Sequence, residues 1–211
     1  MSIVSNPFFV STGTSLFLAL FFTMIACLIL GMGVPTTANY VIMATICAPM
    51  VIRTGAALNV GIPILAAHMF VFYFGIIADI TPPVALAAYA GAAIAKCDPI
   101  KAGLTATKLA IAAFIVPYVF IFNPGMLLIG GSVLKILQAI LSTSIGMVGI
   151  AVGLSGFMFR KVTLPWRFLA IVGGLLLIDA GGITDLIGLI LIASMTAVQL
   201  ITWKREKSAI S

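Results

Sequence analysis

Two short stretches of this 211-residue chain place helix breakers and polar side chains inside otherwise apolar sequence. The first is LGMGVPTTANYV, residues 30–41, and the second is ADITPP, residues 78–83. Proline has no N–H, so Pro35 and the pair Pro82 and Pro83 each leave a backbone carbonyl one turn earlier without its helical partner. In hydrocarbon an unpaired backbone group costs several kcal/mol, so such breaks persist only where protein or a water-filled cavity satisfies them. Both stretches are therefore candidate binding sites.

The two breaks offer ligands for both signs of charge. Freed carbonyl oxygens suit a hard cation such as Na⁺, which prefers oxygen. The half-helix that begins after each break presents unpaired N–H groups and a partial positive charge, which suit a carboxylate. We expect the cation site to involve residues at the end of the first half-helix in each break: Gly31, Met32, Gly33, Ala78, Asp79 and Thr81. We expect the anionic substrate to lie against the prolines and nearby polar residues: Pro35, Thr36, Thr37, Asn39, Pro82 and Pro83.

Each break also has an ordinary explanation. Glycine and proline are common in membrane helices, so a simple kink is the alternative for either break. Asp79 favours a binding site over a simple kink, because an aspartate at the bilayer centre costs at least ~2.5 kcal/mol on insertion scales and usually faces a cavity or a partner. A capping carboxylate without a ligand role is the alternative for this residue.

Enzymatic activity is not expected. An intramembrane enzyme built on Asp79 and His68, the only histidine, would need a second acidic or nucleophilic side chain facing them, and the sequence offers none. No metalloprotease motif, P-loop or nucleophile–base pattern occurs. We expect His68 to be packed or to face a cavity. No cofactor is expected beyond Na⁺ as the coupling ion.

The composition is that of an all-α integral membrane protein. Hydrophobic residues make up 63% of the chain, charged residues 8%, and the mean hydropathy is +1.30, whereas soluble domains carry roughly 25% charged residues. The basic residues behind the net charge of +6 lie at the ends of apolar runs, where they set topology and do not indicate nucleic-acid binding. The cysteines lack C-x-x-C spacing, so we expect apolar fillers: Cys27, Cys47 and Cys97.

Several membrane elements must position the two breaks. Two short apolar runs flank the first break and predict a re-entrant helical hairpin over residues 16–52. The second break divides a discontinuous transmembrane helix over residues 61–96. These elements belong to a transporter-like region, residues 1–130, which precedes a C-terminal membrane extension, residues 131–211.

Further helices follow. Asp98 as N-cap and Pro99 as first residue predict a helix over residues 99–123, kinked at Pro117. Three more crossings are expected, at residues 133–159, 166–178 and 183–203. Glycines at helical spacing in the first of these predict a helix-packing face: Gly146, Gly149, Gly153 and Gly156.

Charge placement orients these elements. Basic residues form three clusters separated by two crossings each: Lys96, Lys101 and Lys108; Arg160, Lys161 and Arg167; and Lys204, Arg205 and Lys207. All three clusters then fall on one side, which the positive-inside rule makes cytoplasmic. The C-terminus is therefore expected to be cytoplasmic and Arg53 external. The turn with Asp179 and Asp185 is also expected outside, where solvation accounts for both carboxylates.

The residues around both breaks resemble a known transporter family. LILGMGVPTTANYVIMATICAPMV and LAAHMFVFYFGIIADITPPVALAAYAGAAIA resemble the C-terminal half of the large membrane subunit, or permease, of tripartite ATP-independent periplasmic (TRAP) transporters. The likeness covers residues 16–130 and is greatest to the fused type that works with TAXI binding proteins. It implies an elevator-type, Na⁺-driven importer of organic acids such as C4-dicarboxylates in the bacterial inner membrane. Residues 31–38 would be the tip of the second hairpin, and residues 78–83 the break in the discontinuous helix.

The resemblance also implies partners. A TRAP permease receives its substrate from a periplasmic binding protein and contains an inverted repeat whose first half is not in this sequence. We therefore expect a fragment or split product that needs this N-terminal half and a small membrane subunit or its fused equivalent, within the lipid bilayer. The last three crossings resemble the extra C-terminal region of TAXI-type fusions. The alternative is a membrane scaffold or remnant without transport activity.

Overall fold

The computed structural model describes residues 16–129, 132–178 and 182–210. Within these residues the chain is helical apart from turns, loops and one isolated bridge between Phe157 and Lys161, which confirms the all-α prediction. The chain divides into two compact units, Met1–Leu127 and Leu128–Ser211. The predicted boundary at residue 130 lies close to this division.

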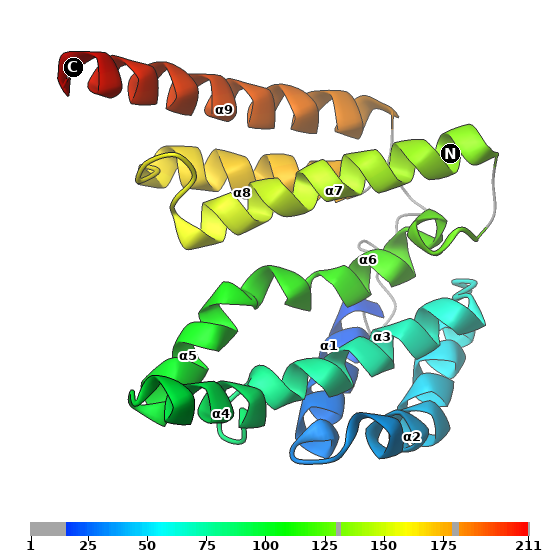
Figure 1. The fold of residues 1–211 in the computed structure, drawn as a ribbon. Coiled ribbons are helices and arrows are strands. Elements are labelled where there is room, and N and C mark those ends of the chain that lie inside the picture. The colour runs from blue at the N-terminus through cyan, green and yellow to red at the C-terminus, as the bar shows by residue number, and fades with distance from the viewer. Residues whose placement is uncertain (1–15, 130–131, 179–181, 211) are drawn as a thin grey trace. The chain divides into compact units, whose positions relative to one another are not determined.

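The first unit begins with a helical hairpin formed by α1 (Leu16–Gly31) and α2 (Thr36–Ala57) (Figure 1). α2 starts directly after Pro35, whose φ of −54° suits the residue before a helix. The second arm runs beyond the predicted end at residue 52. Its 22 residues are long and apolar enough to cross a membrane. The re-entrant course of the hairpin stays a prediction.

The broken helix follows. α3 (Ile64–Ile77) continues as the 3₁₀ turn η2 (Ala78–Ile80), and the chain leaves the helical conformation until α4 (Leu86–Ala95) begins. The interruption lies where the two adjacent prolines remove backbone donors. Ala85, the residue before α4, is buried and has a left-handed φ of 36°, a conformation that costs an L-residue roughly 1–2 kcal/mol.

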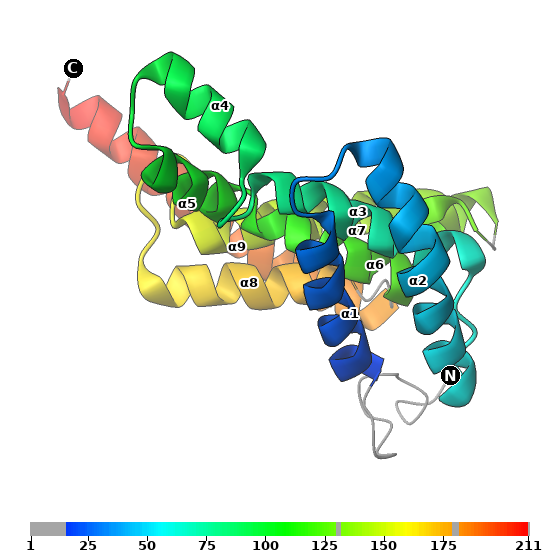
Figure 2. The ribbon, with the colours of Figure 1, turned by 90° about the horizontal axis from the view of Figure 1, so that it is seen from below.

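Aromatic rings hold the first half of the broken helix in place. α3 packs against α1, α2 and α6 (Val116–Phe122) (Figure 2). Phe70 and Phe74 of α3 are fully buried, and their ring centroids lie 5.3 and 5.8 Å from that of Tyr118 in α6. Such packing, rather than exclusion of water, holds helices together in a bilayer. The core therefore fixes the position of the break at the end of α3.

The predicted start of the next helix is confirmed. α5 (Pro99–Leu109) has Asp98 as its N-cap, whose Oδ1 accepts a hydrogen bond of 3.0 Å from the backbone N–H of Lys101. Proline at the first position and a capping carboxylate both suit a helix start.

The predicted kink at Pro117 is wrong. The bend lies at Ala110, where α5 gives way to the 3₁₀ turn η3 (Ile111–Phe114), and the segments Pro99–Leu109 and Ile111–Phe122 differ in direction by 57°. Pro117 is the second residue of α6. Proline does not distort a helix there, because the N–H groups of the first turn have no intrahelical acceptor.

The described residues of the second unit form three helices, α7 (Val133–Ser155), α8 (Leu164–Ile178) and α9 (Gly182–Ile210), as the sequence predicts. α8 packs against both neighbours. α7 and residues 182–202 of α9 are long and apolar enough to cross a membrane. The 15 residues of α8 are fewer than the roughly 20 of a typical crossing.

Glycines bring α7 close to its neighbours, as predicted. A Cβ on Gly146 would lie 2.7 Å from the Gly174 carbonyl oxygen, and a Cβ on Gly153 would lie 2.8 Å from the Arg167 carbonyl oxygen. Gly156 does not belong to this packing face, because it ends α7 with a left-handed φ of 70°. Glycine suits that C-terminal position because it has no Cβ.

Two expectations about single residues need correction. Cys27 and Cys47 are buried, as expected of apolar fillers, but Cys97 is exposed. Asp185 lies in the first turn of α9, where its Oδ2 accepts a 2.9 Å hydrogen bond from Gln138 Nε2 and its Oδ1 lies 2.6 Å from Ser142 Oγ. Solvation alone therefore does not account for Asp185. Asp179 lies outside the described residues.

Candidate functional site

The two breaks meet at one pocket of about 460 Å³ in the first unit. The hairpin tip forms one wall, and Asp79 with the first turn of α4 forms the other. The lining residues are Gly33, Val34, Pro35, Thr36, Asp79, Leu86 and Ala87. Segments about fifty residues apart in the sequence thus enclose a single space, as the expected site requires.

The hairpin tip presents the start of α2 to the pocket. α1 ends at Gly31, and Gly33 adopts a φ of 74° that reverses the chain. Pro35 precedes α2, and no side chain caps its first N–H groups. The first turn of a helix carries unpaired N–H groups and a partial positive charge. An anion is therefore favoured at this wall.

The freed carbonyls are less open than the sequence predicts. The backbone N–H of Val34 lies 3.4 Å from the Gly31 carbonyl oxygen, and that of Thr81 donates to the Ala78 carbonyl oxygen at 3.2 Å. Both bonds are tight-turn replacements for the helical bonds that the prolines remove. A carbonyl oxygen has two lone pairs, so each can still bind a cation.

Side chains support the second break as well. Thr81 Oγ1 donates to the Ile77 carbonyl oxygen at 2.8 Å, and Tyr89 donates its hydroxyl to the Pro83 carbonyl oxygen at 2.9 Å. Thr107 Oγ1 lies 3.0 Å from the Ile80 carbonyl oxygen. These bonds explain how an irregular backbone persists in an apolar chain. The hydroxyl proton of Thr81 is used within the break, while its oxygen retains acceptor capacity.

Asp79 is the charged member of the pocket. Its side chain is half-buried and lies across from residues 33–36. Among the described residues, none donates a hydrogen bond to its carboxylate or pairs with it. A carboxylate removed from water without donors is costly. Asp79 therefore offers its negative charge to a guest in the pocket, and a cation fits this position.

The described part of the chain contains no cluster of three or more His, Cys, Asp or Glu side chains that could hold a metal ion. The pocket instead offers one carboxylate together with backbone and hydroxyl oxygens. This donor set lacks the nitrogen and sulfur ligands that transition metals prefer. It suits a hard monovalent or divalent cation.

The structure brings together four of the twelve predicted site residues: Gly33, Pro35, Thr36 and Asp79. The others are not among the lining residues: Gly31, Met32, Thr37, Asn39, Ala78, Thr81, Pro82 and Pro83. Sequence reasoning missed three lining residues, Val34, Leu86 and Ala87. The last two are the first residues of α4, the half-helix that the sequence places after the second break, but the predicted site residues stopped at Pro83.

Asn39 is placed differently from its expected role. It is 2% exposed on the inner face of α2, and its Nδ2 donates to the Gly75 carbonyl oxygen of α3 at 2.9 Å. Its Oδ1 is buried without a hydrogen-bond partner among the described residues. Asn39 thus joins the hairpin to α3 and is not among the residues that line the pocket.

His68 is half-buried and does not line the pocket. The hydroxyl of Tyr40 lies 3.1 Å from its Nδ1, and the two rings meet edge to face. A packed histidine accounts for this geometry.

Comparison with known proteins identifies a family for most of this region. The family model described as "Tripartite ATP-independent periplasmic transporter, DctM component" matches residues 3–134, which is more than half of the chain. Neither the curated proteins nor the solved structures contain a match to this sequence.

Proposed function

This chain belongs to the tripartite ATP-independent periplasmic transporter family as a DctM component, a part of the membrane permease, and we propose that its pocket binds Na⁺ together with an organic acid during import. The observation that carries this proposal is the position of Asp79. Its carboxylate has no donor among the described residues and shares one pocket with the N-terminus of α2.

Charge balance links the two guests. Two like charges ~4 Å apart repel by about 4 kcal/mol at an effective dielectric constant of 20. A substrate carboxylate at the start of α2 would meet this repulsion from Asp79. A Na⁺ ion beside Asp79 removes it, so binding of the cation favours binding of the acid. Such mutual dependence is what coupled transport requires.

The proposed roles follow from this order. Na⁺ binds the Asp79 carboxylate and oxygens of the surrounding backbone and hydroxyl groups, contributed by Gly31, Met32, Gly33, Ala78 and Thr81. The acid binds the first-turn N–H groups of α2 and the hydroxyls of Thr36 and Thr37, between walls shaped by Pro35, Pro82 and Pro83. Asn39 supports the hairpin tip from behind, through its bond to Gly75.

The wider assembly follows from the family. DctM components work with a periplasmic binding protein and other membrane subunits, and the chain is a multi-pass membrane protein by its family and its apolar helices. We propose that the binding protein is of the TAXI type and that an N-terminal half of the permease, supplied separately, completes the site. The location is the bacterial inner membrane, with the C-terminus in the cytoplasm.

The test is uptake by the complete assembly. The chain is co-expressed with the N-terminal half, placed in proteoliposomes and supplied with the cognate binding protein and a panel of radiolabelled organic acids. We expect uptake only under an inward Na⁺ gradient. Equal uptake in Na⁺ and K⁺ media would contradict the Na⁺ assignment, and no uptake of any acid would favour a scaffold.

A matched pair of variants locates the cation. Asp79→Asn should abolish Na⁺-driven uptake or raise the Na⁺ concentration that gives half-maximal uptake by at least tenfold. Asp98→Asn makes the same change at an exposed N-cap, where asparagine caps as well as aspartate, and should leave uptake unchanged. Equal activity of the two variants would remove Asp79 from the site.

A further inference from the structure

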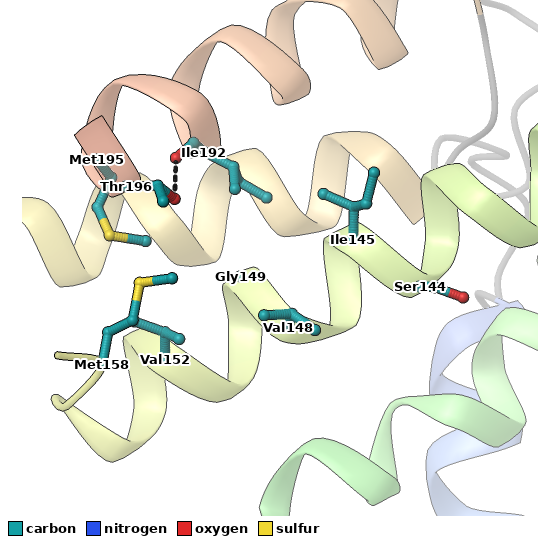
Figure 3. Close-up of a pocket in the computed structure, with 9 residues that line it drawn as sticks. All are labelled: Ser144, Ile145, Val148, Gly149, Val152, Met158, Ile192, Met195 and Thr196. Atoms are coloured by element: carbon teal, nitrogen blue, oxygen red, sulfur yellow. Dashed lines mark hydrogen bonds between the residues drawn. The ribbon is translucent and has the colours of Figure 1, made fainter. Parts of the chain in front are cut away.

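A second hollow lies in the other unit, between α7 and α9 (Figure 3). Its volume is about 340 Å³. The walls are almost wholly apolar, with Ile145, Val148 and Val152 on α7 and Ile192 and Met195 on α9. The hydroxyl of Thr196, also in the wall, already donates to the Ile192 carbonyl oxygen at 2.8 Å. The groove therefore suits an apolar guest.

The groove persists because neither helix can close it. α8 packs against both α7 and α9, so it sets their separation. At Gly149 a Cβ would lie 2.5 Å from Ile192 Cδ1, so the two helices are already in contact there. Val148, beside this contact, remains 56% exposed.

The turn at one end of the groove carries basic residues. Met158 lines this end and belongs to the turn at residues 156–163, which also carries Arg160 and Lys161. Met158 N–H donates to the Arg160 carbonyl oxygen at 3.2 Å, so the turn folds back on itself beside the groove. Lys161 is exposed. Residues 156–167 contain three basic residues and no acidic one.

Arg167 adds its charge at the same end. Its Nε and Nη2 donate to the carbonyl oxygens of Gly153 and Leu154, the last turn of α7, at 2.8 and 2.9 Å. These bonds hold the guanidinium next to the basic turn.

We propose that this groove binds one acyl chain of an anionic phospholipid, whose phosphate lies against the basic turn at residues 156–163. An apolar groove that ends at cationic side chains matches a molecule with an acyl chain and a negative headgroup, and basic pockets between membrane helices bind such lipids. A free phosphate ion is a poorer match, because it would not fill the apolar groove. A partner helix is also a poorer match, because it would not account for the basic turn at the end of the groove. The proposal is independent of the transport function.

The chain contains a reporter for this site. Trp166 packs against a buried cluster that includes Val152 and Met195, two residues of the groove wall. The only other tryptophan is Trp203, so Trp203→Phe leaves a single fluorophore. The full chain with this change is reconstituted in phosphatidylcholine bilayers that contain increasing fractions of brominated phosphatidylglycerol or brominated phosphatidylcholine. We expect brominated phosphatidylglycerol to reach half-maximal quenching of Trp166 at a several-fold lower mole fraction than brominated phosphatidylcholine.

Two surface variants complete the test. Lys161→Gln should weaken the preference for phosphatidylglycerol about fivefold, the effect of one basic residue at an anionic surface. Lys135→Gln makes the same change at the opposite end of α7, where Lys135 is exposed, and should have no effect. Equal quenching by the two lipids, or an equal loss in both variants, would overturn the proposal. Absence of quenching by either lipid would show that protein fills the groove, which also overturns it.

Discussion

Asn39 is a buried amide between two helices that cannot tolerate a larger neighbour. A Cβ on Gly75 would lie 2.9 Å from Asn39 Nδ2, and one on Gly31 would lie 3.1 Å from the same atom. Both glycines therefore make room for the amide. The bond from Nδ2 to the Gly75 carbonyl oxygen ties the hairpin to the helix that carries Asp79.

We expect Asn39→Ala and Gly75→Ala each to lower the free energy of unfolding by about 1–3 kcal/mol, the first by removing a buried hydrogen bond and the second by overpacking. The double variant should lose less than the sum of the two, because alanine at position 39 makes room for the new methyl group. Thermal unfolding in detergent measures the stability of the two single variants and the double variant. Thr45→Val, at an exposed position, serves as a control. Simple additivity would mean that the two residues act independently.

Gly33 tests the conformation of the hairpin tip. Its φ is 74°, and a Cβ there would approach only Val84 Cγ1, at 3.9 Å. Gly33→Ala should therefore cost about 1–2 kcal/mol for the left-handed conformation alone, with weaker substrate uptake. Gly33→Asn should retain more stability and uptake, because asparagine tolerates this conformation better than alanine. Equal losses in thermal unfolding would indicate a steric rather than a conformational requirement.

Residue types located the pocket more reliably than they assigned roles within it. Asp79, Pro35 and Thr36 could be found because a charge or a helix breaker is conspicuous in apolar sequence. Asn39 is equally conspicuous, yet its environment depends on Gly75, 36 residues later in the chain. A single polar residue on a helix does not reveal which face the rest of the fold will cover.

Helix starts and stops show the same contrast. The sequence predicts the hairpin, the broken helix and the start of α5, because proline, glycine and an N-cap act within one turn of the chain. The 57° bend at Ala110 has no such signal, since AIAAFI contains neither glycine nor proline. The bond between Asp185 and Gln138 depends on how α9 lies against α7, which sequence periodicity does not specify.

The end of α7 supplies a prediction about a single helix terminus. Arg167 donates two hydrogen bonds to the last carbonyls of α7, and hydrogen bonds to charged groups contribute about 1.5–3 kcal/mol. Arg167→Gln should speed amide hydrogen exchange in the last turn of α7 and lower the unfolding temperature. Lys161→Gln, in the adjoining turn, should do neither. Unchanged amide exchange in the Arg167 variant would mean that Gly156 alone stabilises the end of α7.

The orientation of the whole chain can be tested with a thiol already present. Cys97 is exposed between α4 and α5, whereas Cys27 and Cys47 are buried. Cys97 follows Lys96, which belongs to a basic cluster that is predicted to be cytoplasmic. A membrane-impermeant maleimide should therefore label the chain in inside-out vesicles and spare it in right-side-out vesicles. Cys97→Ser should abolish the labelling. Labelling from the periplasmic side alone would reverse the predicted topology.

The Asn39–Gly75 bond also limits how the hairpin can separate from α3. α1 reaches the second break directly, since a Cβ on Gly31 would lie 3.0 Å from that of Ala78. Separating the hairpin from α3 would remove the Asn39 donor from the Gly75 carbonyl oxygen in an apolar interior, at a cost of about 1–3 kcal/mol. We therefore expect the hairpin and α3 to move as one body in any rearrangement that opens the pocket.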